Sequence, residues 1–575
     1  MKLRSPAELG FRLRQLAANV ALWLSKGQRP ERPLRQVAQY REHMLTLLPD
    51  VPREELVALA SSIVAHRFPI FSTHIDTGHA IEWRRDYLSN RTSGLQYFRF
   101  VPYLDAARVG DHKIIWELNR QQHMVVLARA FDVTGDAVYL TEITSQLRSW
   151  RTQNPFLRGI NWASALEVAF RVLSWLTVLA LLGDRLPAAE RDALHADLYR
   201  HGRYLEHNLS VYFSPNTHLL GEALALAALG RVLDVERWQK LGDGILAAQR
   251  AVQVHSDGGY FEQSDYYHVY ALDMYLLHYL LLARQDDALE ALLLNMCGFL
   301  ATVMGPERRL PQLGDDDGGN LFWPYGSRQQ FGHAALQRAA RLLSREFPGQ
   351  ATALLAATGP AAVTLGDLFA LVDCGPFGPG GAGHSHSDTL SMVLRYAGHD
   401  ILIDAGTFTY TGDPAARNIF RGSAAHSTVR IDARDQADPV HPFRWENKPA
   451  VKIVAWETGD AHAVLIAKCE ARGVVHRREV RFEPDSLLVI DRLTGPPGQH
   501  RIEQFWHTPQ TPQQQGNTVH LGPATLQLSD DAAVDIQPAE YSVCYGQKAA
   551  SHRIRATRNS TLPCELQARF TFRKS

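Results

Sequence analysis

Histidine and acidic side chains gather between residues 383 and 388, where the sequence reads GHSHSD. A Gly/Pro-rich loop precedes this segment and an apolar run follows it. If the segment is extended, the alternation of side chains along a strand places His384, His386 and Asp388 on one side. The loop is not a phosphate cradle, because it lacks the G-K-[ST] sequence and its prolines remove backbone N–H donors.

Two further polar residues stand where predicted strands end or begin. Asp404 closes the apolar run ILI, and His426 lies in AAHSTV just before another run. Two histidines and one aspartate at neighbouring strand ends suit a borderline divalent ion such as zinc. The same residues also fit a metal-free arrangement in which they cap strand ends and bond to one another, so the residue types leave both interpretations open.

Two polar motifs fall within the helical half of the chain. In SPNTHLLGE (214–222), Pro215 and Asn216 suit a helix start, and His218 and Glu222 share one helical face. The plain interpretation is an N-cap followed by a His–Glu pair. The second motif, DGGYFEQSDYYH (257–268), is a turn that leads into a helix. If its aromatic residues belong to the core, the polar residues among them need buried partners.

Asn161-Trp162, followed by Glu167 and Arg171, places an aromatic ring and a cation on successive helical turns. Tryptophan is a good platform for a sugar ring, and it is also common in protein cores.

The elements that must position these residues differ between the two halves of the chain. From about residue 35 to 357, apolar residues recur with helical spacing, as in 165–183, 218–233 and 269–285. After 364–375 the period changes to two, and short β-branched or aromatic runs alternate with turns. We expect paired helices that form a solenoid or toroid, followed by an antiparallel β-sandwich. The predicted division is 1–34, 35–360 and 361–575.

Composition excludes several classes of protein. Lys plus Arg number 60 and Asp plus Glu number 60, so a dedicated nucleic-acid binder is not expected. The five cysteines form no C-x-x-C pair, which disfavours a thiolate zinc site or a disulfide scaffold. Apolar stretches such as 173–182 are shorter than the ~18 residues that span a bilayer. In residues 1–34, Arg12 and Arg14 interrupt the apolar residues, which predicts an amphipathic helix. A conventional signal peptide has an unbroken apolar segment instead.

Several motifs together resemble the heparinase II/III-like polysaccharide lyases, a group that includes alginate and oligoalginate lyases. The motifs are WASALEVAFRVLSWL, SPNTHLLGEAL, DGGYFEQSDYYHVY, PQLGDDDGG, GHSHSDTLSMVLRYAGHDILIDAGTFTY and FRGSAAHSTVRID. The resemblance covers nearly the whole chain and implies an incomplete (α/α) toroid followed by an antiparallel β-sandwich. It also implies β-elimination in a uronic-acid-containing, glycosaminoglycan-like polysaccharide, with 4,5-unsaturated uronate ends as product.

The resemblance implies roles for individual residues. Tyr267 matches the family's tyrosine and is expected to act as general base and acid, with Tyr266 as the alternative one residue away. His218 matches the family's histidine. Many members have Asn immediately before that histidine, whereas this chain has Thr217 there and Asn216 one residue earlier, which puts the role of Asn216 in doubt.

The GHSHSD motif divides between two tasks in the family. His384 is expected beside the reacting sugar, and His386, Asp404 and His426 are expected to hold one structural divalent ion, zinc by ligand type. The predicted substrate contacts are Trp162, Arg171, Glu222, Tyr266, Tyr410 and Arg421.

Three alternatives remain open at this point. The substrate could be alginate or a bacterial exopolysaccharide. A glycoside hydrolase would need two opposed carboxylates, for which Asp315 and Asp317 are candidates. A non-catalytic exopolysaccharide-binding or biosynthesis-associated protein would bind a polysaccharide with the same residues but would not cleave it. The family suggests a periplasmic or secreted protein, the absence of a conventional signal leaves the cytoplasm open, and the sequence does not define the oligomeric state.

Overall fold

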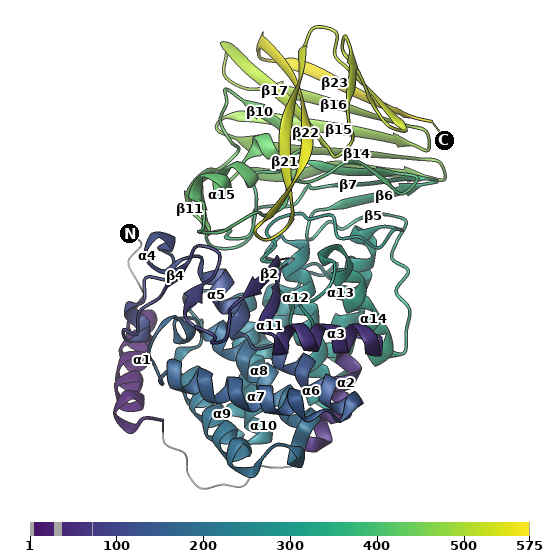
Figure 1. Cartoon of the computed structure of the whole chain (residues 1–575). Helices are drawn as coiled ribbons and strands as arrows, with labels where there is room; N and C mark the ends of the chain where they lie inside the picture. Colours follow the sequence, from purple (N-terminus) through teal and green to yellow (C-terminus); the bar gives the residue numbers. More distant parts are fainter. Residues whose placement is uncertain (1–4, 28–36, 72, 574–575) are drawn as a thin grey trace. The chain divides into compact units, whose positions relative to one another are not determined.

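The structure is a computed structural model that describes residues 5–27, 37–71 and 73–573 (Figure 1). Its contacts divide the chain into two compact units. The first contains residues 1–252, 273–287 and 319–326, and the second contains 253–272, 288–318 and 327–575. The predicted domain boundaries at residues 34 and 360 stay predictions. The chain passes between the two units several times, so neither unit is one continuous segment.

The first unit is built from helices. Its main helices are α1 (Pro6–Ser25), α2 (Arg41–Leu47), α3 (Arg53–Val64), α4 (Ala106–Val109), α5 (His112–Asn119), α6 (His123–Thr134), α7 (Ala137–Gln153), α8 (Ala165–Leu182), α9 (Ala188–Asn208), α10 (Thr217–Val232) and α11 (Glu236–Gln253). Four short strands also occur, β1 (Arg67–Ile70), β2 (Thr73–Asp76), β3 (Arg85–Asp86) and β4 (Arg91–Thr92), paired β1 with β2 and β3 with β4. The sequence analysis did not predict these strands.

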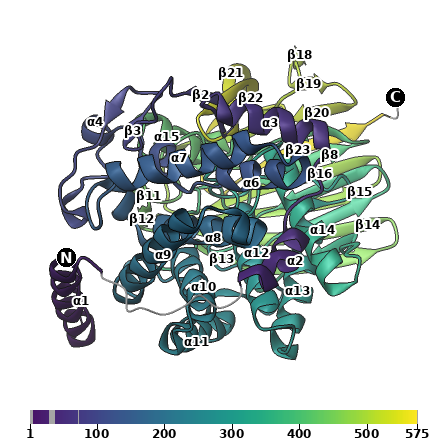
Figure 2. The same cartoon turned by 60° about the horizontal axis from the view of Figure 1, so that its bottom comes forward.

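Helix α8 is the centre of this unit. Seventeen of its eighteen residues are buried, as expected for a helix that is apolar on nearly all sides. It packs against α6, α9 and α10 (Figure 2). Gly183 ends the helix with φ 53°, a conformation that glycine adopts without strain. The predicted helices at 165–183 and 218–233 are therefore confirmed as α8 and α10.

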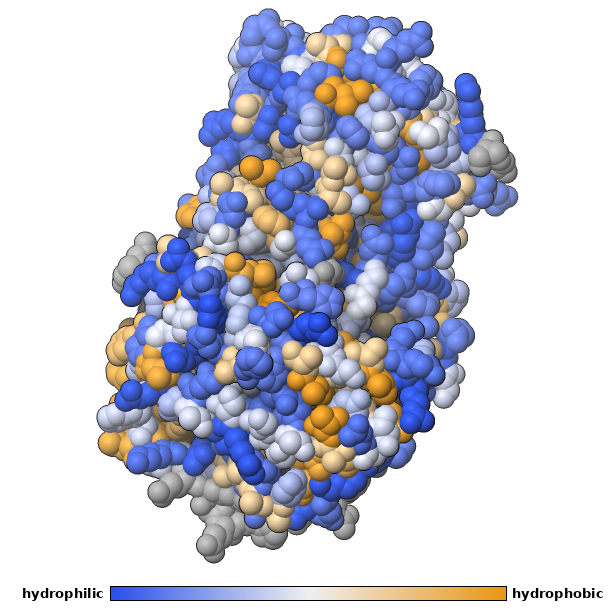
Figure 3. Space-filling model, viewed as in Figure 1, coloured by the Kyte–Doolittle hydropathy of each residue, from blue (hydrophilic) through white to orange (hydrophobic). Residues whose placement is uncertain are grey.

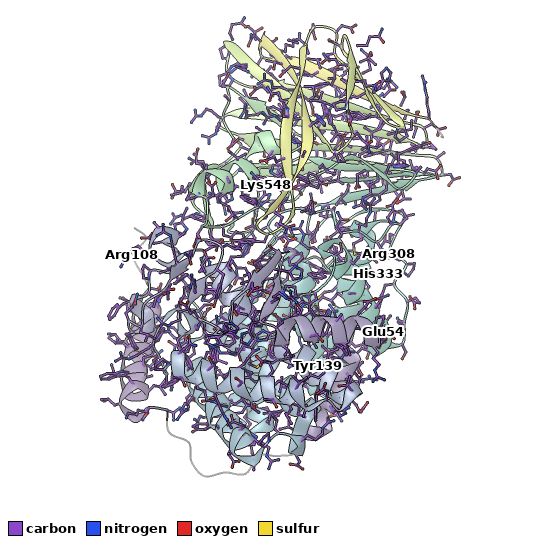
Figure 4. All side chains as sticks on the ribbon, in the orientation of Figure 1. Glu54, Arg108, Tyr139, Arg308, His333 and Lys548 are labelled. Atoms are coloured by element: carbon purple, nitrogen blue, oxygen red, sulfur yellow. The ribbon has the colours of Figure 1, made fainter. Side chains whose placement is uncertain are left out.

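Helices also open the second unit. They are α12 (Asp265–Leu281), whose residues from 273 belong to the first unit, α13 (Asp287–Met304) and α14 (Phe331–Leu343), with α15 (Pro414–Phe420) further along. Arg308 and His333, labelled in Figure 4, belong to this helical part. The Arg308 guanidinium donates to the carbonyls of Phe347 and Pro348 at 2.8 and 2.9 Å. This attaches the end of α13 to the segment that follows α14.

Antiparallel sheets make up the rest of the second unit. One has the order β5-β6-β7-β8-β9, another β10-β17-β22-β21, and the largest β13-β14-β15-β16-β23-β20-β19-β18, while β11 pairs with β12. The strands are β5 (Thr352–Leu354), β6 (Ala361–Leu365), β7 (Leu368–Val372), β8 (Met392–Tyr396), β9 (His399–Leu402), β10 (Val429–Ile431), β11 (Asp438–His441), β12 (Arg444–Glu446), β13 (Ala450–Gly459), β14 (His462–Ala471), β15 (Val474–Glu483), β16 (Ser486–Thr494), β17 (Gln499–Thr508), β18 (Gln513–Gln515), β19 (Thr518–Leu521), β20 (Ala524–Leu528), β21 (Ala533–Cys544), β22 (Gln547–Thr561) and β23 (Cys564–Phe572).

The alternation of side chains explains how these sheets pack. Along β14, buried residues alternate with more exposed ones, the pattern of a strand with one face in the core. Apolar side chains from all three large sheets form one buried cluster, which includes Leu394, Leu465, Trp506 and Phe570. The predicted order of helices first and an antiparallel sandwich second is confirmed.

Two helices of the described chain are long and apolar enough to cross a bilayer by length and composition, Ala165–Arg185 and Asp287–Met304. Both pass by mean hydropathy, and the first contains Glu167 and Arg171, so the expectation about unbroken apolar stretches is not contradicted. Their most apolar windows are 89% and 56% buried inside the protein. Core helices of a folded domain pass the same test, so the two helices are weak evidence for a membrane span.

Candidate active site

One carboxylate joins both histidines of the GHSHSD motif in the second unit. Asp315 Oδ2 lies 3.1 Å from His384 Nδ1, and Asp315 Oδ1 lies 2.9 Å from His386 Nε2. The backbone N–H of Asp315 also donates to the His384 carbonyl at 2.8 Å. The motif itself is a loop and not the strand considered above. Both histidines nevertheless face one group, the Asp315 carboxylate.

The loop that carries Asp315 depends on Gly314. This glycine has φ +68°, and a Cβ at this position would collide with the carbonyl oxygens of Gln263 and His384. Only glycine fits such a left-handed position with backbone so close. The approach of the two loops therefore depends on Gly314.

Arg417, on α15, completes the environment of Asp315. Its Nη2 lies 2.7 Å from Asp315 Oδ2 and its Nη1 donates to Oδ1, which makes the pair bidentate. Thr407 Oγ1 donates to the same Oδ1 at 3.1 Å. Burial would raise the pKa of Asp315, but Arg417 and the two histidines hold that pKa well below its usual value. Asp315 is thus an ionised carboxylate that orients His384 and His386.

The aromatic ring of Tyr267 stacks on the imidazole of His384, with ring centroids 3.8 Å apart. Tyr267 lies in the first turn of α12, where its backbone N–H donates to Ser264 Oγ at 3.2 Å. Ser264 Oγ in turn donates to the Asp315 carbonyl at 2.6 Å. The start of α12 and the Asp315 loop are therefore held together, and this positions the tyrosine on the histidine.

Tyr410 lies at the other end of the Tyr267 side chain. The two hydroxyl oxygens are 3.2 Å apart, and the Arg417 guanidinium lies 5.0 Å from the Tyr410 ring centroid. The structure thus brings together three sequence-predicted residues, Tyr267, His384 and Tyr410, within one unit.

The charges around this cluster act differently on its two titratable groups. Burial raises the pKa of Tyr267 well above its ordinary value, and the charges of Asp317, Asp315 and Glu262 add to the effect. Burial would lower the pKa of His384, but Glu262, 3.5 Å from Nε2, and Asp315 raise it above its ordinary value. The ring of a tyrosine whose neutral form is favoured therefore stacks on a histidine whose protonated form is favoured.

His386, Asp404 and His426 form the metal-ligand group expected from the sequence. Their candidate ligand atoms all lie within 4.8 Å of one another, and all three residues are buried. His386 Nδ1 and His426 Nε2 are buried without a hydrogen-bond partner. The other nitrogen of each ring is held by a carboxylate, Asp315 for His386 and Asp404 for His426 at 2.8 Å. A histidine with one nitrogen fixed by a carboxylate and the other free is the usual arrangement of a metal ligand, so these residues fit a divalent ion.

Asn216 and His218 belong to the first unit, at the start of α10. Asn216 is the N-cap of this helix, and its Oδ1 accepts the backbone N–H of His218 at 3.1 Å. The plain N-cap interpretation of the motif is therefore confirmed, while the catalytic roles of both residues stay predictions.

Glu222 is fully buried one turn further along α10. Its carboxylate accepts the backbone N–H and the hydroxyl of Ser210, both at 2.6 Å. Burial raises the pKa of Glu222 to about 8. These contacts attach the segment before α10 to the helix, and the structure does not support the expected substrate contact.

The structure also places Trp162 and Arg171 in the core of the first unit. Arg171 is fully buried and donates to His201 Nε2 and to the carbonyls of Asn119 and Asn161. Its guanidinium lies 5.6 Å from the ring of Trp162, which is itself buried. Because every one of these donors faces an internal acceptor, the expectation that the two residues contact substrate is not supported.

Two further predicted substrate contacts belong to the second unit. Arg421 is buried, lies over the Trp445 ring at 4.5 Å, and donates to Asn418 Oδ1 and the Pro442 carbonyl. Tyr266 packs against the rings of Tyr270 and Phe331. Both are parts of the local packing, and their contact with substrate stays a prediction.

Sequence reasoning missed the positioning group of the site, Asp315 with Arg417. The sequence pattern indicated Asp315 only as half of a hydrolase pair, yet it is fully buried. Arg417 stands four residues before Arg421, the arginine that was singled out. The available signal was the run GDDDGG, since three successive acidic residues in a buried loop must have cationic partners.

Family models match both halves of the chain. The model of the heparinase II/III N-terminus matches residues 32–320, and that of the heparinase II/III-like C-terminal region matches residues 348–568. A heparin-sulfate lyase of Pedobacter heparinus is 27% identical in an alignment that covers 67% of this chain and 61% of the relative. A heparin-sulfate lyase of Bacteroides stercoris is 23% identical, over 67% of this chain and 63% of the relative. The matched region thus spans less than two thirds of either relative.

Solved structures show the same fold. The structure named heparinase III has a TM-score of 0.69 at 16% identity, covering 98% of this chain and 90% of its own. A mutant heparan sulfate lyase HepC from Pedobacter heparinus has a TM-score of 0.63 at 21% identity, covering 94% of this chain and 88% of its own. Chondroitin AC lyase from Streptomyces coelicolor is more distant, with a TM-score of 0.55 at 12% identity, covering 94% and 83%.

Proposed function

The chain belongs to the heparinase II/III-like family, and from this we propose that it is a lyase that cleaves a uronic-acid-containing, glycosaminoglycan-like polysaccharide by β-elimination. The observation that carries the proposal is the Tyr267 ring stacked on the imidazole of His384, which Asp315 orients. The relatives named as heparin-sulfate lyases support a sulfated glycosaminoglycan as the first substrate to test.

The proposed reaction removes the C5 proton of the uronate and breaks the bond to the O4 leaving group. Loss of the proton places a second negative charge beside the carboxylate, so a cationic donor must stabilise the enediolate. Protonated His384 fits this task, because Glu262 and Asp315 favour its charged form. Tyr267 is the proton-transfer residue: its hydroxyl first loses its proton to solvent, the tyrosinate then takes the C5 proton, and the re-formed hydroxyl gives a proton to O4.

The hydrolase alternative lacks the carboxylate pair that it requires. Asp315 forms a bidentate ion pair with Arg417, and Asp317 accepts the Tyr270 hydroxyl at 3.0 Å. A general acid must hold a proton at working pH, whereas Arg417 and the two histidines keep Asp315 ionised. The geometry therefore favours elimination over hydrolysis.

Product chemistry tests the proposal. Purified protein is incubated with heparan sulfate, heparin, chondroitin sulfate, hyaluronan and alginate, and the far-ultraviolet absorbance of the new C4–C5 double bond is followed. We expect absorbance to grow with at least one glycosaminoglycan and more slowly, or not at all, with alginate. New reducing ends without absorbance would identify a hydrolase, and binding without any new ends would identify a non-catalytic polysaccharide-binding protein.

We further propose that His386, Asp404 and His426 hold one divalent ion, zinc by ligand type. When bound, such an ion supplies a fixed positive charge that stabilises the loop carrying His384. Three protein ligands of this type suit zinc better than magnesium or calcium, which prefer oxygen ligands.

Elemental analysis of the purified protein is expected to find about one zinc per chain. His426→Ala should lose this ion, and chelation should lower the melting temperature of wild type, because an ion that binds only the folded state stabilises it. His476→Ala is the matched control, since His476 is a buried histidine bonded to Asp491 and outside the ligand group. Wild-type protein without metal, or metal retained in His426→Ala, contradicts the site.

A further inference from the structure

Helix α1 attaches to the first unit by one face. Asn19 and Leu22 are buried on this face, and the side-chain amides of Asn19 and Asn208 donate to each other at 2.9 Å. The Phe11 ring lies 5.2 Å from the ring of Tyr212. Figures 1 and 2 show α1 at the rim of the helical unit, beside α9. These contacts fix which side of the helix faces away from the protein.

The side of α1 that faces away is apolar. We call it the α1 stripe, and its residues share one face of the helix at spacings of four and three. They are Leu9, Leu13, Leu16, Val20 and Trp23, with Leu24 beside them, and each has about half or more of its surface exposed. Orange side chains gather along the lower left edge of Figure 3, where α1 lies. Single exposed apolar residues are ordinary, whereas a continuous row marks an interaction surface.

Two exposed aromatic side chains lie near the attached side of α1. Phe213 is 64% exposed and directly follows Tyr212, the residue in contact with Phe11. Phe100 is 76% exposed, and its neighbour Arg99 donates to Gln15 Oε1 at 3.1 Å. Exposed apolar side chains of this region are therefore not confined to α1.

Positive charge accompanies the stripe. Residues 1–35 of the sequence contain eight Lys or Arg and two Asp or Glu, although the whole chain has equal numbers of both kinds. In the described part of this region, Arg12 pairs with Glu8, and Arg14 and Lys26 are exposed. A basic helix with an exposed row of Leu, Val and Trp is typical of segments that lie in the plane of a membrane interface.

We propose that the α1 stripe binds the surface of an anionic lipid bilayer, with the helix lying parallel to that surface. The apolar side chains would enter the boundary between headgroups and acyl chains, and the cations would face lipid phosphates. A second copy of the chain is less suitable, because pairing two α1 helices brings like charges together. A polyanionic polysaccharide matches the charges but offers no apolar partner for the row of leucines.

The test uses the full chain, its mass confirmed so that α1 is present, with two kinds of vesicle. One contains phosphatidylcholine alone and the other also contains phosphatidylglycerol. We expect co-sedimentation with the anionic vesicles, decreasing as salt is added, because salt screens the charge attraction. Leu13→Ser combined with Val20→Ser should weaken binding by about tenfold or more, since each loses its buried apolar contribution.

Val454→Ser is the matched control. Val454 lies on β13 in the other unit and has the same exposure as Val20, 49%, so this variant should bind vesicles as wild type does. Arg14→Glu should weaken binding to the anionic vesicles. Equal binding by wild type and the double variant overturns the proposal. It is also overturned if vesicles are not bound and size-exclusion chromatography shows a dimer that the double variant abolishes, since the stripe would then join two copies.

Discussion

Tyr267→Phe is expected to lower kcat/KM on the best glycosaminoglycan substrate by about 100-fold or more, the usual contribution of a general acid or base. The phenyl ring keeps the stack on His384, and the variant loses only the hydroxyl that lies 3.2 Å from the Tyr410 hydroxyl. The melting temperature should therefore remain close to that of wild type. Initial rates of ultraviolet absorbance and a thermal melt measure both quantities.

Tyr266→Phe provides the matched control, because Tyr266 precedes Tyr267 on α12 and packs against Tyr270 and Phe331. We expect this variant to retain most of the activity. A large loss in Tyr266→Phe with a normal rate in Tyr267→Phe would assign the proton transfer to Tyr266.

The pH dependence separates the two steps assigned to Tyr267. A base must be deprotonated before it acts, and burial with nearby acids raises the pKa of Tyr267 well above 10. The wild-type kcat/KM is therefore expected to rise with pH on the alkaline side of neutral, while the residual rate of Tyr267→Phe should not. A wild-type rate that is independent of pH in this range would restrict Tyr267 to proton donation.

The sequence predicted the elements of the fold well because their signals are local. A period of 3.6 marked α8 and α10, and a period of two marked strands such as β14, β15 and β16. Both periods follow from side-chain direction along the backbone and need no knowledge of distant contacts. The set of potential metal ligands had another source, since the resemblance to the lyase family indicated His386, Asp404 and His426 together, and their candidate ligand atoms lie within 4.8 Å of one another.

Burial was harder to predict. Arg171 and Arg421 are cations near promising motifs, and both are buried among internal acceptors and aromatic rings. An arginine that neutralises a substrate and one that holds a core together have the same residue type and similar neighbours in sequence. Only the three-dimensional contacts distinguish them, because the acceptors of Arg171 come from residues 119, 161 and 201.

The same limit explains why Asp315 was not assigned. Its partners His384, His386 and Arg417 lie 69, 71 and 102 residues away in sequence. No periodicity connects residues at such separations. The acidic run alone fits an exposed turn as well as a buried network.

Asp315→Asn is expected to impair stability, metal affinity and activity together. The neutral amide leaves the buried Arg417 guanidinium without its charged partner, which typically costs about 3–5 kcal/mol. It also removes the carboxylate that fixes His386, and loss of such a partner typically lowers metal affinity about 10–100-fold. Because His384 loses the same carboxylate, we expect kcat/KM per folded molecule to fall by about 100-fold or more.

Asp491→Asn separates these effects from the general cost of breaking a buried ion pair. Asp491 is also fully buried, forms a bidentate pair with Arg478 and bonds to His476, yet it contacts none of the site residues described above. Denaturant unfolding, elemental analysis and initial rates are measured for both variants. We expect a similar loss of stability in both, and loss of metal affinity and turnover only in Asp315→Asn.

If Asp491→Asn loses turnover to the same extent, activity follows overall stability and Asp315 does not orient the histidines for catalysis. If Asp315→Asn keeps wild-type turnover with weakened metal binding, His384 is positioned without this carboxylate, and the Tyr267–His384 stack alone would have to hold the imidazole in place.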